Sequence, residues 1–427
     1  MTLRVAIAGL GTVGTGVAKV LLGNADNLRI RAGRPIQFTV FSALDIAKAK
    51  DLDLARVKRE TDPQNLARGD ADVVVELMGG EEGAARQLVE AALRAGKHVV
   101  TANKALLAHH GAQLAPLAED GNVALKFEAA VAGGIPVVKA LRESLIANPI
   151  SAVRGILNGT CNFILTQMEA TGRGFAEVLR DAQTLGYAEA DPALDVGGGD
   201  TAHKLTLLAS LAFGTVPDLA SVDVTGIEKI SAADIAFARE FGYRVKLLGI
   251  ARATATGVEQ RVHPAMVKAG TPLADVEGSF NAVVADCGDA DSYFFEGRGA
   301  GQGPTASAVV ADIVDIARGN IGPVFGLPVA QLRKAKPLAP QERVSAYYLR
   351  FNVLDVPGVM AEISRRLAEH GISIDSMLQR GRSPGESVPI VMITHEAPHV
   401  AVQRALKAIA ASDKVFDTPC MIPMEAP

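Results

Sequence analysis

The sequence predicts a mixed α/β protein in three parts: an N-terminal doubly wound parallel sheet, a central α+β part, and a small C-terminal module of the order βαββαβ. Three observations support this prediction. Strand and helix patterns alternate over residues 1–132, their texture changes at Gly133, and a charged, proline-bearing linker at 334–340 precedes a second alternation. With 427 residues, of which 48% are hydrophobic, the chain can bury two or three separate cores.

The N-terminal part begins with a short apolar run at residues 4–8, which is typical of a buried parallel strand. A glycine-rich turn follows it and leads into a helical stretch at 15–22. Later segments repeat this alternation, which is the pattern of a doubly wound sheet. Further strands are expected at 36–41, 72–78 and 98–101, and an alanine-rich helix is expected at 84–95.

The two later parts show different patterns. The central part mixes strand-like segments at 153–157 and 245–251 with long helices. The C-terminal module packs its alternation into a short segment, with expected strands at 347–353, from 371 onward and at 388–394, and expected helices at 357–370 and 400–411.

The composition excludes several classes of protein. The formal net charge is −4 and no basic residues cluster, so no nucleic-acid binding is expected. No apolar run approaches the roughly 18 residues that span a bilayer, and no cleavable apolar segment opens the chain, so a cytoplasmic location is expected. The cysteines, Cys161, Cys287 and Cys420, are far apart and predict reduced thiols, not a disulfide frame or a zinc site.

The glycine-rich turn carries the first chemical signal. Gly9, Gly11 and Gly14, with Thr12 and Val13 between the last two, stand after a strand and before a helix. In a dinucleotide-binding turn of the Rossmann type, the first glycine makes the tight turn, the second admits the pyrophosphate and the third lets helix and strand pack closely. Glycine-rich turns are common, so the alternative is a purely structural turn.

The sequence signal for the ribose end of this site is less specific. Asp45 follows the second strand and could hold a ribose 2′-hydroxyl, which would favour NAD. It lies further from the glycines than the usual spacing because an insertion at 24–34 intervenes, and no arginine stands beside it in the sequence. The equal alternative is an aspartate that caps a helix at 46–50.

Lys104 follows the strand at 98–101, at the carboxyl edge where ligands of open α/β sheets bind. Such a lysine can reach a cofactor or a substrate carboxylate. The alternative from position alone is a surface lysine at a helix start.

The densest charge lies at residues 186–204, where Glu189, Asp191, Asp195, Asp200 and Lys204 surround a glycine triplet. Asp200 and Lys204 are four residues apart and share one face of a helix. A lysine in a partly desolvated pocket can act as a general acid, with the aspartate as its partner or as an acceptor for a substrate ammonium. The alternatives are an ordinary intrahelical salt bridge and a divalent metal site, although no histidine cluster favours the latter.

Several segments together resemble homoserine dehydrogenases. The similarity runs from residue 5 to about residue 330, and the tail after it looks like an ACT domain, a module that typically binds an amino acid. The resemblance therefore implies NAD(P)-dependent, reversible reduction of L-aspartate 4-semialdehyde to L-homoserine, in threonine, isoleucine and methionine biosynthesis. The segments that carry it are 101–104, 128–136, 158–160, 186–192, 195–204, 297–301 and 304–308.

The resemblance also implies roles for individual residues. Lys204 would donate a proton to the aldehyde oxygen as hydride arrives from the nicotinamide, and Lys104 would support catalysis near the cofactor. Glu189, Asp195 and Asp200 would bind the amino-acid part of the substrate. Gly186 and Gly301 would line the site of NADP or NAD, and a monovalent cation, typically sodium, would be bound largely by backbone carbonyls of Glu128, Val131, Gly133 and Ile135.

The resemblance assigns the parts of the chain as well. It implies a dinucleotide-binding domain at 1–132 completed by 304–330, a catalytic and dimerisation domain at 133–303, a linker at 331–344 and an ACT domain at 345–427. Threonine is expected as an effector, with the helix start after 355–358 as its site, because a helix N-terminus can take a carboxylate. The alternative is that the module serves only assembly, and a homodimer or homotetramer is expected.

Two departures from the family pattern stand out. Residues 43–45 are Ala-Leu-Asp where many relatives have an arginine, which puts a strict preference for NADP in doubt, and Cys161 replaces a more usual threonine. Two other functions remain open from the sequence: a related dehydrogenase of another amino acid, and a non-catalytic protein that senses an amino acid.

Overall fold

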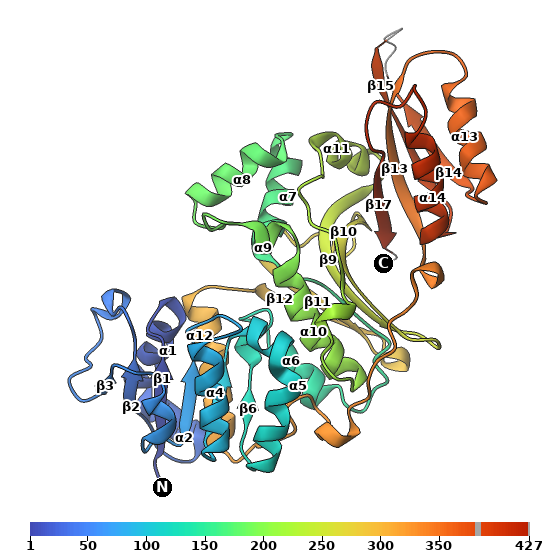
Figure 1. The fold of residues 1–427 in the computed structure, drawn as a ribbon. Coiled ribbons are helices and arrows are strands. Elements are labelled where there is room, and N and C mark those ends of the chain that lie inside the picture. The colour runs from blue at the N-terminus through green and yellow to red at the C-terminus, as the bar shows by residue number, and fades with distance from the viewer. Residues whose placement is uncertain (381–385, 426–427) are drawn as a thin grey trace.

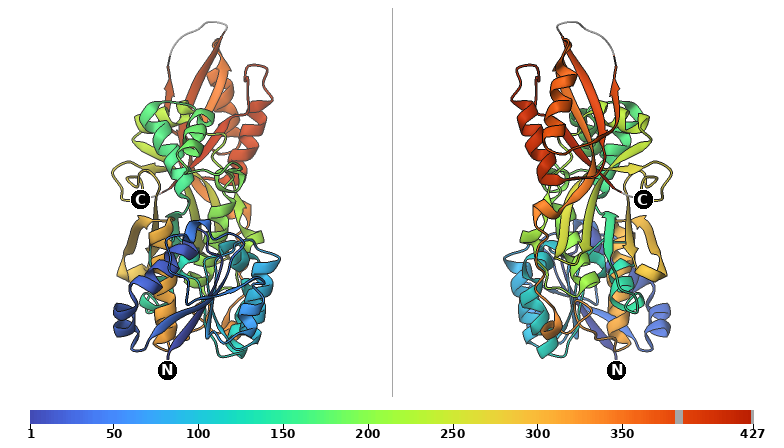
Figure 2. Two further views of the ribbon diagram at one scale, coloured as in Figure 1. Left: turned by 90° about the vertical axis from the view of Figure 1, so that its left-hand side faces the viewer. Right: turned by 90° about the vertical axis from the view of Figure 1, so that its right-hand side faces the viewer.

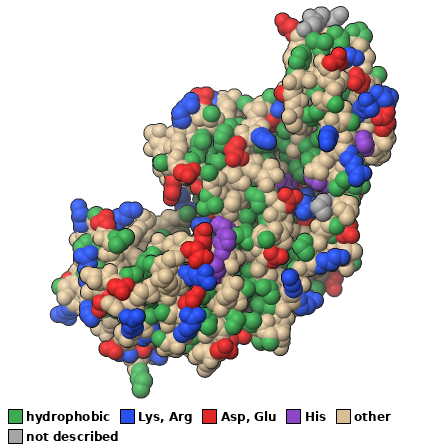
Figure 3. Space-filling model, viewed as in Figure 1, with side chains coloured by type: hydrophobic (Ala, Val, Ile, Leu, Met, Phe, Trp, Pro, Cys, Tyr) green, Lys and Arg blue, Asp and Glu red, His purple; other side chains and the backbone are tan. Residues whose placement is uncertain are grey.

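The computed structural model describes residues 1–380 and 386–425. Three bodies follow one another along the molecule (Figure 1), and Figure 2 shows the N-terminal sheet at one end and the C-terminal module at the other. The described chain ends beside the central body. On the face in Figure 3, acidic and basic side chains are interspersed. None of the helices described at 1–380 and 386–425 is long and apolar enough to cross a bilayer.

The N-terminal body is a six-stranded parallel sheet in the order β3-β2-β1-β4-β5-β6. The order reverses between β1 and β4, which creates the switch point where ligands of such sheets bind. The expected strands are confirmed, and two very short ones join them at the edges. The strands are β1 (Leu3–Ala8), β2 (Ile36–Ser42), β3 (Lys58–Glu60), β4 (Val73–Glu76), β5 (His98–Thr101) and β6 (Leu125–Lys126).

Helices cover both faces of this sheet, as expected for the doubly wound class. The expected insertion at 24–34 contains a helix, because α2 spans Ala25–Ala32. A late helix, α12 (Gln302–Ala317), returns to pack on α1, and a Cβ at Gly16 would lie 2.9 Å from Cβ of Ala306, so glycine allows this close approach. The remaining helices of this body are α1 (Thr12–Gly23), α3 (Asn65–Arg68), α4 (Ala84–Arg94) and α5 (Lys104–Asp120).

The central body is a strongly curved sheet in the order β12-β11-β7-β9-β10, and α10 (Gly199–Phe213) packs across β7, β9 and β10. Nearly every residue of α10 is buried, because it packs both on β9 and on α5 of the N-terminal body. The strands are β7 (Ala152–Ile156), β8 (Asp223–Val224), β9 (Tyr243–Ala253), β10 (Val258–Lys268), β11 (Phe280–Asp286) and β12 (Ser292–Arg298). The other helices are α6 (Val137–Lys139), α7 (Gly159–Thr171), α8 (Phe175–Thr184), α9 (Ala193–Val196) and α11 (Ala232–Glu240).

The C-terminal module has the expected βαββαβ order and a hydrophobic core of its own. Its antiparallel sheet runs β17-β13-β15-β14, with α13 and α14 packed against each other. The elements are β13 (Val344–Leu354), α13 (Val359–Glu369), β14 (Ile374–Gln379), β15 (Ser387–Thr394), the short β16 (Ala397–Pro398), α14 (His399–Ala410) and β17 (Cys420–Glu425).

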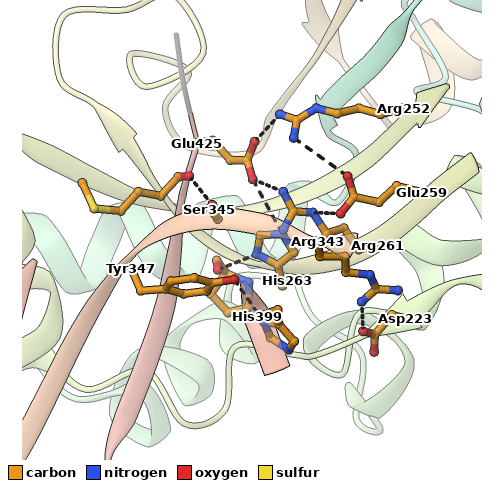
Figure 4. Close-up of polar contacts among 12 residues, drawn as sticks. Asp223, Arg252, Glu259, Arg261, His263, Arg343, Ser345, Tyr347, His399 and Glu425 are labelled. Carbon is orange, nitrogen blue, oxygen red and sulfur yellow. Dashed lines mark hydrogen bonds and ion pairs between the residues drawn. The ribbon is translucent and has the colours of Figure 1, made fainter. Parts of the chain in front are cut away.

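The C-terminal sheet is continuous with the central sheet, which the sequence did not predict. Strand β17 pairs in parallel with β10 through Met424 opposite Met266 and Glu425 opposite Val267. The buried carboxylate of Glu425 forms ion pairs with Arg252, over 2.7 Å, and with Arg261 (Figure 4). The linker is attached too, because Leu338 donates its N–H to the carbonyl of Val258 over 2.9 Å.

Candidate active site

The glycine-rich turn has the geometry that a pyrophosphate requires. Gly9 has a φ of +97°, and a Cβ there would lie 2.6 Å from the carbonyl oxygen of Leu77. A Cβ at Gly14 would lie 1.9 Å from the carbonyl oxygen of Gly9, so helix α1 could not pack on β1 with a larger residue. A Cβ at Gly11 would meet nothing within 4 Å, so open space lies over the start of α1. This cradle fits a dinucleotide phosphate.

Basic side chains lie at the ribose end of the same turn. The Nζ of Lys48 donates to Oγ1 of Thr12 over 2.9 Å, and Arg59, on β3, donates to the carbonyl of Ala43 over 3.1 Å. Asp45 accepts the N–H of Ala47 over 2.7 Å, which forms a local turn before a short 3-10 helix at Ala47–Ala49, where a helix at 46–50 was expected. The N-cap of that 3-10 helix is Ile46, and no side chain caps it. Arg59 was missed in the sequence because it belongs to a different strand.

The buried carboxylate of Glu76, at the end of β4, orders the loop that follows this strand and faces the glycine-rich turn. Glu76 accepts the N–H groups of Met78 and Gly79 over 2.7 and 3.1 Å, and the hydroxyl of Thr101 over 2.7 Å. Asn103 caps α5 at Leu106 and donates to the carbonyl of Gly80 over 2.6 Å. These bonds fix the start of α5 at Lys104.

The carboxylate of Asp200 lies between two lysines from different bodies of the molecule. The Nζ of Lys104, on α5, is 3.1 Å from Oδ1, and the Nζ of Lys204, on α10, is 2.8 Å from Oδ2. The side-chain amide of Asn158 donates to Oδ2 over 2.8 Å. Burial alone would raise the pKa of Asp200, but the two lysine charges and the hydrogen bonds outweigh it and hold that pKa far below its usual range.

Within the part of the chain that the structure describes, the lysine of α10 keeps one donor unused. Lys204 donates to the carbonyl of Leu157 over 2.6 Å and to Asp200 over 2.8 Å. An ammonium group has three N–H donors, so one remains for a substrate oxygen. Asp195 completes the cluster by accepting from Asn158 over 2.7 Å, and burial together with the charge of Asp200 raises the pKa of Asp195.

The other residues expected in the site lie apart from this cluster. Glu189 is exposed, and among the described residues its carboxylate forms no hydrogen bond or ion pair. Gly186 occupies an exposed turn with a φ of +78°, and Gly301 precedes α12 with a φ of +115°, so both positions favour glycine. The structure thus brings Lys104, Asp195, Asp200 and Lys204 together, without Glu189.

Asn158 and the carbonyl of Leu157 are the polar groups that sequence reasoning gave no role. Asn158 also caps α7, accepting the N–H of Cys161 over 2.8 Å. An asparagine followed by Gly-Thr at a helix start is a recognisable capping signal, but capping does not reveal that its amide also bridges two carboxylates.

The expected cation loop is sharply turned. Ala132 and Gly133 have φ values of +52° and +28°. Within the described chain, no donor reaches the carbonyl oxygens of Val131 and Gly133, whereas the carbonyl of Ile135 accepts from Val137 over 2.8 Å. The side chain of Glu128 points away, accepting the N–H groups at 138 and 139 over 3.0 and 2.8 Å. Glu128 could therefore offer an ion its backbone carbonyl, which already accepts the N–H of Val131 over 3.5 Å.

A divalent metal site finds no support in this region. Across residues 1–380 and 386–425, no group of three or more His, Cys, Asp or Glu side chains is arranged to hold a metal ion. The carboxylates at 186–204 are instead engaged with lysines and amides, or exposed.

Comparisons with known proteins agree along the whole chain. A family model described as the NAD binding domain of homoserine dehydrogenase matches residues 9–128. A model described as homoserine dehydrogenase matches 136–314, and an ACT domain model matches 347–413. The three matches follow the order of the three bodies in the structure.

Individual relatives cover nearly the full length. The homoserine dehydrogenase of Neisseria gonorrhoeae is 45% identical over 99% of this chain and 98% of its own. The crystal structure of a homoserine dehydrogenase from Thiobacillus denitrificans is 42% identical, with a TM-score of 0.94 and coverage of 100% of this chain and 98% of that one. A hyperthermophilic archaeal homoserine dehydrogenase in complex with NADPH is 26% identical, with a TM-score of 0.65, over 76% of this chain and 100% of that one. The chain belongs to the homoserine dehydrogenase family.

Proposed function

We propose that Lys204 is the general acid in the reduction of L-aspartate 4-semialdehyde to L-homoserine. The observation that supports this role is its unused N–H, because Leu157 and Asp200 hold the ammonium in place and leave one proton for the aldehyde oxygen. In the reverse direction, Lys204 takes the proton back from the hydroxyl of homoserine. The bound nicotinamide coenzyme supplies or accepts the hydride.

The neighbouring carboxylates and the second lysine have supporting roles in this proposal. Asp200 keeps Lys204 and Lys104 charged and oriented, since it pairs with both. Asp195 and Asp200 attract the substrate ammonium, and Glu189 reaches it from its exposed loop. Lys104 lies at the first residue of α5, beside the switch point of the sheet, and so stands between substrate and coenzyme.

We propose that the coenzyme site accepts NADP. Gly9, Gly11 and Gly14 cradle the pyrophosphate, while Gly186 and Gly301 line the site further along. The cations of Arg59 and Lys48, neither of which is next to Asp45 in the sequence, supply the charge that a 2′-phosphate needs. The solved structure of the archaeal relative is a complex with NADPH, which also supports NADP as the coenzyme of this chain.

We propose that the loop at 128–136 binds a monovalent cation, with sodium as the expected ion. The carbonyl oxygens of Val131 and Gly133, which accept no hydrogen bond from the described residues, support this, because neutral oxygens suit a weakly charged ion. The carbonyls of Glu128 and Ile135 would complete the site from the same loop.

The division of the chain follows from these roles. We place the dinucleotide-binding domain at 1–132 with 304–330, the catalytic and dimerisation domain at 133–303, the linker at 331–344 and the regulatory ACT domain at 345–427. The packing of α12 on α1 supports the return of 304–330 to the first domain. We further propose a homo-oligomer whose activity threonine inhibits through the ACT domain.

Replacing Lys204 with alanine tests the proton-transfer role. The Lys204→Ala variant should lose about 10²- to 10⁴-fold in kcat, because general acid catalysis contributes that much, while its affinity for NADPH changes little. Steady-state oxidation of L-homoserine and fluorescence titration with NADPH measure the two quantities. A variant that keeps more than about a tenth of the wild-type kcat would overturn the assignment.

A further inference from the structure

Glu76 ends strand β4 beside the switch point of the N-terminal sheet, and its whole side chain is buried. Burial of a carboxylate is unfavourable unless other groups compensate its charge. Across residues 1–380 and 386–425, no basic side chain forms an ion pair with Glu76, and three hydrogen-bond donors compensate the charge instead. These donors come from the segment that follows β4 and from the end of β5, so the carboxylate joins the two segments.

One oxygen of Glu76 holds the loop that follows β4. Its Oε1 accepts the N–H of Met78 over 2.7 Å and that of Gly79 over 3.1 Å. The loop packs directly on the glycine-rich turn, because the carbonyl oxygen of Leu77 lies 2.6 Å from where a Cβ of Gly9 would be. The position of this loop therefore sets one wall of the proposed coenzyme site.

The other oxygen of Glu76 starts a relay of hydrogen bonds toward Lys104. Its Oε2 accepts the hydroxyl of Thr101 over 2.7 Å, from the residue directly opposite in the pairing of β4 with β5. The oxygen of that hydroxyl accepts the N–H of Asn103 over 3.0 Å, and its single hydrogen serves Glu76, so the direction of each bond is fixed. Asn103 caps α5, whose first residue, Lys104, reaches Asp200 over 3.1 Å. The relay therefore ends at the lysine of the catalytic cluster.

A further bond closes these contacts into a ring. The side-chain amide of Asn103 donates to the carbonyl of Gly80, in the loop at 77–80, over 2.6 Å. Gly79 and Gly80 have φ values of +81° and +84°, which glycine adopts readily, so the loop can turn back toward α5. The loop and the start of α5 are thus bonded to each other and to Glu76, and neither can shift without breaking a bond of the ring.

We propose that Glu76 is a positioning residue that sets the loop at 77–80 and Lys104 as one unit. A coenzyme that packs against the loop then also orders the lysine that meets Asp200. Because Glu76 is fully buried, it acts through these two parts and not by contact with the substrate. This role deepens the proposed function and rests on it, since it assumes the coenzyme turn and the supporting role of Lys104.

Two substitutions of Thr101 test the relay to Lys104. Thr101→Val keeps the shape of the side chain but removes the hydroxyl, so kcat for the oxidation of L-homoserine should fall about tenfold or more, because misplaced groups lower rates steeply. The dissociation constant for NADPH, from fluorescence titration, should stay near the wild-type value. Thr101→Ser keeps the hydroxyl and should retain most of kcat. A serine variant slower than the valine variant would show that packing matters instead and would overturn the relay.

A second buried threonine provides a matched control for stability. Thr394, in the C-terminal module, is also buried, and its hydroxyl oxygen accepts the N–H of Tyr347 over 3.0 Å. Thr394→Val should lower the melting temperature, as Thr101→Val does, but leave kcat and the dissociation constant for NADPH unchanged. If both valine variants lost kcat in proportion to their melting temperatures, the effect of Thr101 would be one of stability alone and the relay would be wrong.

Glu76→Gln tests the bonds to the loop. Glutamine has one acceptor oxygen and one NH₂ donor, so it cannot accept hydrogen bonds at both ends of the group as the carboxylate does. The dissociation constant for NADPH should rise about tenfold and kcat should fall with it, because both parts lose bonds to a charged group. A wild-type dissociation constant would overturn the part of Glu76 in holding the loop.

A double variant shows whether Thr101 acts through Lys104. If it does, Thr101→Val should lower kcat no further in a Lys104→Met protein, since substitutions in one chain of contacts are not additive. Losses that multiply in the double variant would overturn the relay. A wild-type kcat in Lys104→Met would remove the proposed role of Lys104 and the relay with it, and the NADPH titration of Glu76→Gln would then decide the loop by itself.

Discussion

The side-chain amide of Asn158 lies 2.8 Å from Oδ2 of Asp200 and donates a hydrogen bond to it. The same nitrogen reaches Asp195 over 2.7 Å, so one amide fixes the spacing of two carboxylates. Asn158→Ser should keep the cap of α7, since serine also caps well, but lose both long-range bonds. We expect kcat to fall about tenfold to a hundredfold, because a hydrogen bond to a charged group contributes about 1.5–3 kcal/mol.

Steady-state kinetics with a melting curve checks this prediction. The melting temperature should fall modestly, because two hydrogen bonds to buried carboxylates are lost, while kcat falls and the KM for the coenzyme stays constant. A wild-type kcat in Asn158→Ser would mean that Asp200 needs no help from the amide.

Coenzyme selection should depend on Arg59 and Lys48. Arg59→Gln and Lys48→Gln each remove a cation at the ribose end, so the KM for NADPH should rise about tenfold while that for NADH changes little. Lys58→Gln, at the neighbouring residue of β3, is the control, because adjacent strand residues point to opposite faces. Kinetics with both coenzymes side by side measure the effect, and equal losses for NADH and NADPH would contradict it.

Sodium should support activity through the loop at 128–136. Exchange of sodium for choline at constant ionic strength should lower kcat severalfold, and added sodium should restore it with a saturable dependence. In Gly133→Ala this dependence should be lost, because a Cβ there would lie 2.6 Å from the carbonyl oxygen of Gly299 and displace the loop. Gly23→Ala, where a Cβ meets nothing within 4 Å, should respond as the wild type does. Full activity in choline would rule out the ion.

Acid should destabilise the protein through His263. Burial and then the charge of Arg261 lower the pKa of His263 to about 3, whereas an unfolded histidine titrates near about 6.5. Below about pH 6.5, His263 binds a proton in the unfolded state but not in the folded state. The free energy of unfolding therefore falls as pH falls. Between pH values of about 7.5 and 5.5, this loss is about 1.4 kcal/mol for the wild type and absent in His263→Gln. Urea unfolding at both pH values measures it, and equal pH dependence in the two proteins would refute it.

Local patterns predicted the elements that bury continuous apolar faces and failed at the others. The strands β1 and β4 are almost entirely buried and stand out in the sequence. Strand β3 consists of Lys-Arg-Glu, and α2 buries only Leu28 and Ala32, so neither has an apolar pattern to detect. The joining of β17 to β10 depends on pairing between distant segments, which no local pattern encodes.

The contacts of the candidate site also fall into two groups, those that local spacing predicts and those that depend on the tertiary fold. The spacing of Asp200 and Lys204 predicted one shared helix face, and the structure has their side chains 2.8 Å apart. The contact of Lys104 with Asp200 arises because α5 and α10 pack across two bodies, which depends on the tertiary fold. Arg59 and Lys48 were missed for the same reason, since their neighbours come from other elements.

The shared sheet has a practical consequence for truncation. A chain that stops before residue 341 loses β17, so the backbone groups of Met266 and Val267 become an open strand edge, which is prone to pair with another molecule. It also loses Glu425, one of the two carboxylates that Arg252 and Arg261 share, while Glu259 stays 3.9 and 3.2 Å from them. Such a fragment would tend to self-associate and precipitate, and its loss of inhibition would say little about regulation. Single substitutions beside the pairing of β17 with β10 avoid this artefact because they leave the strand in place.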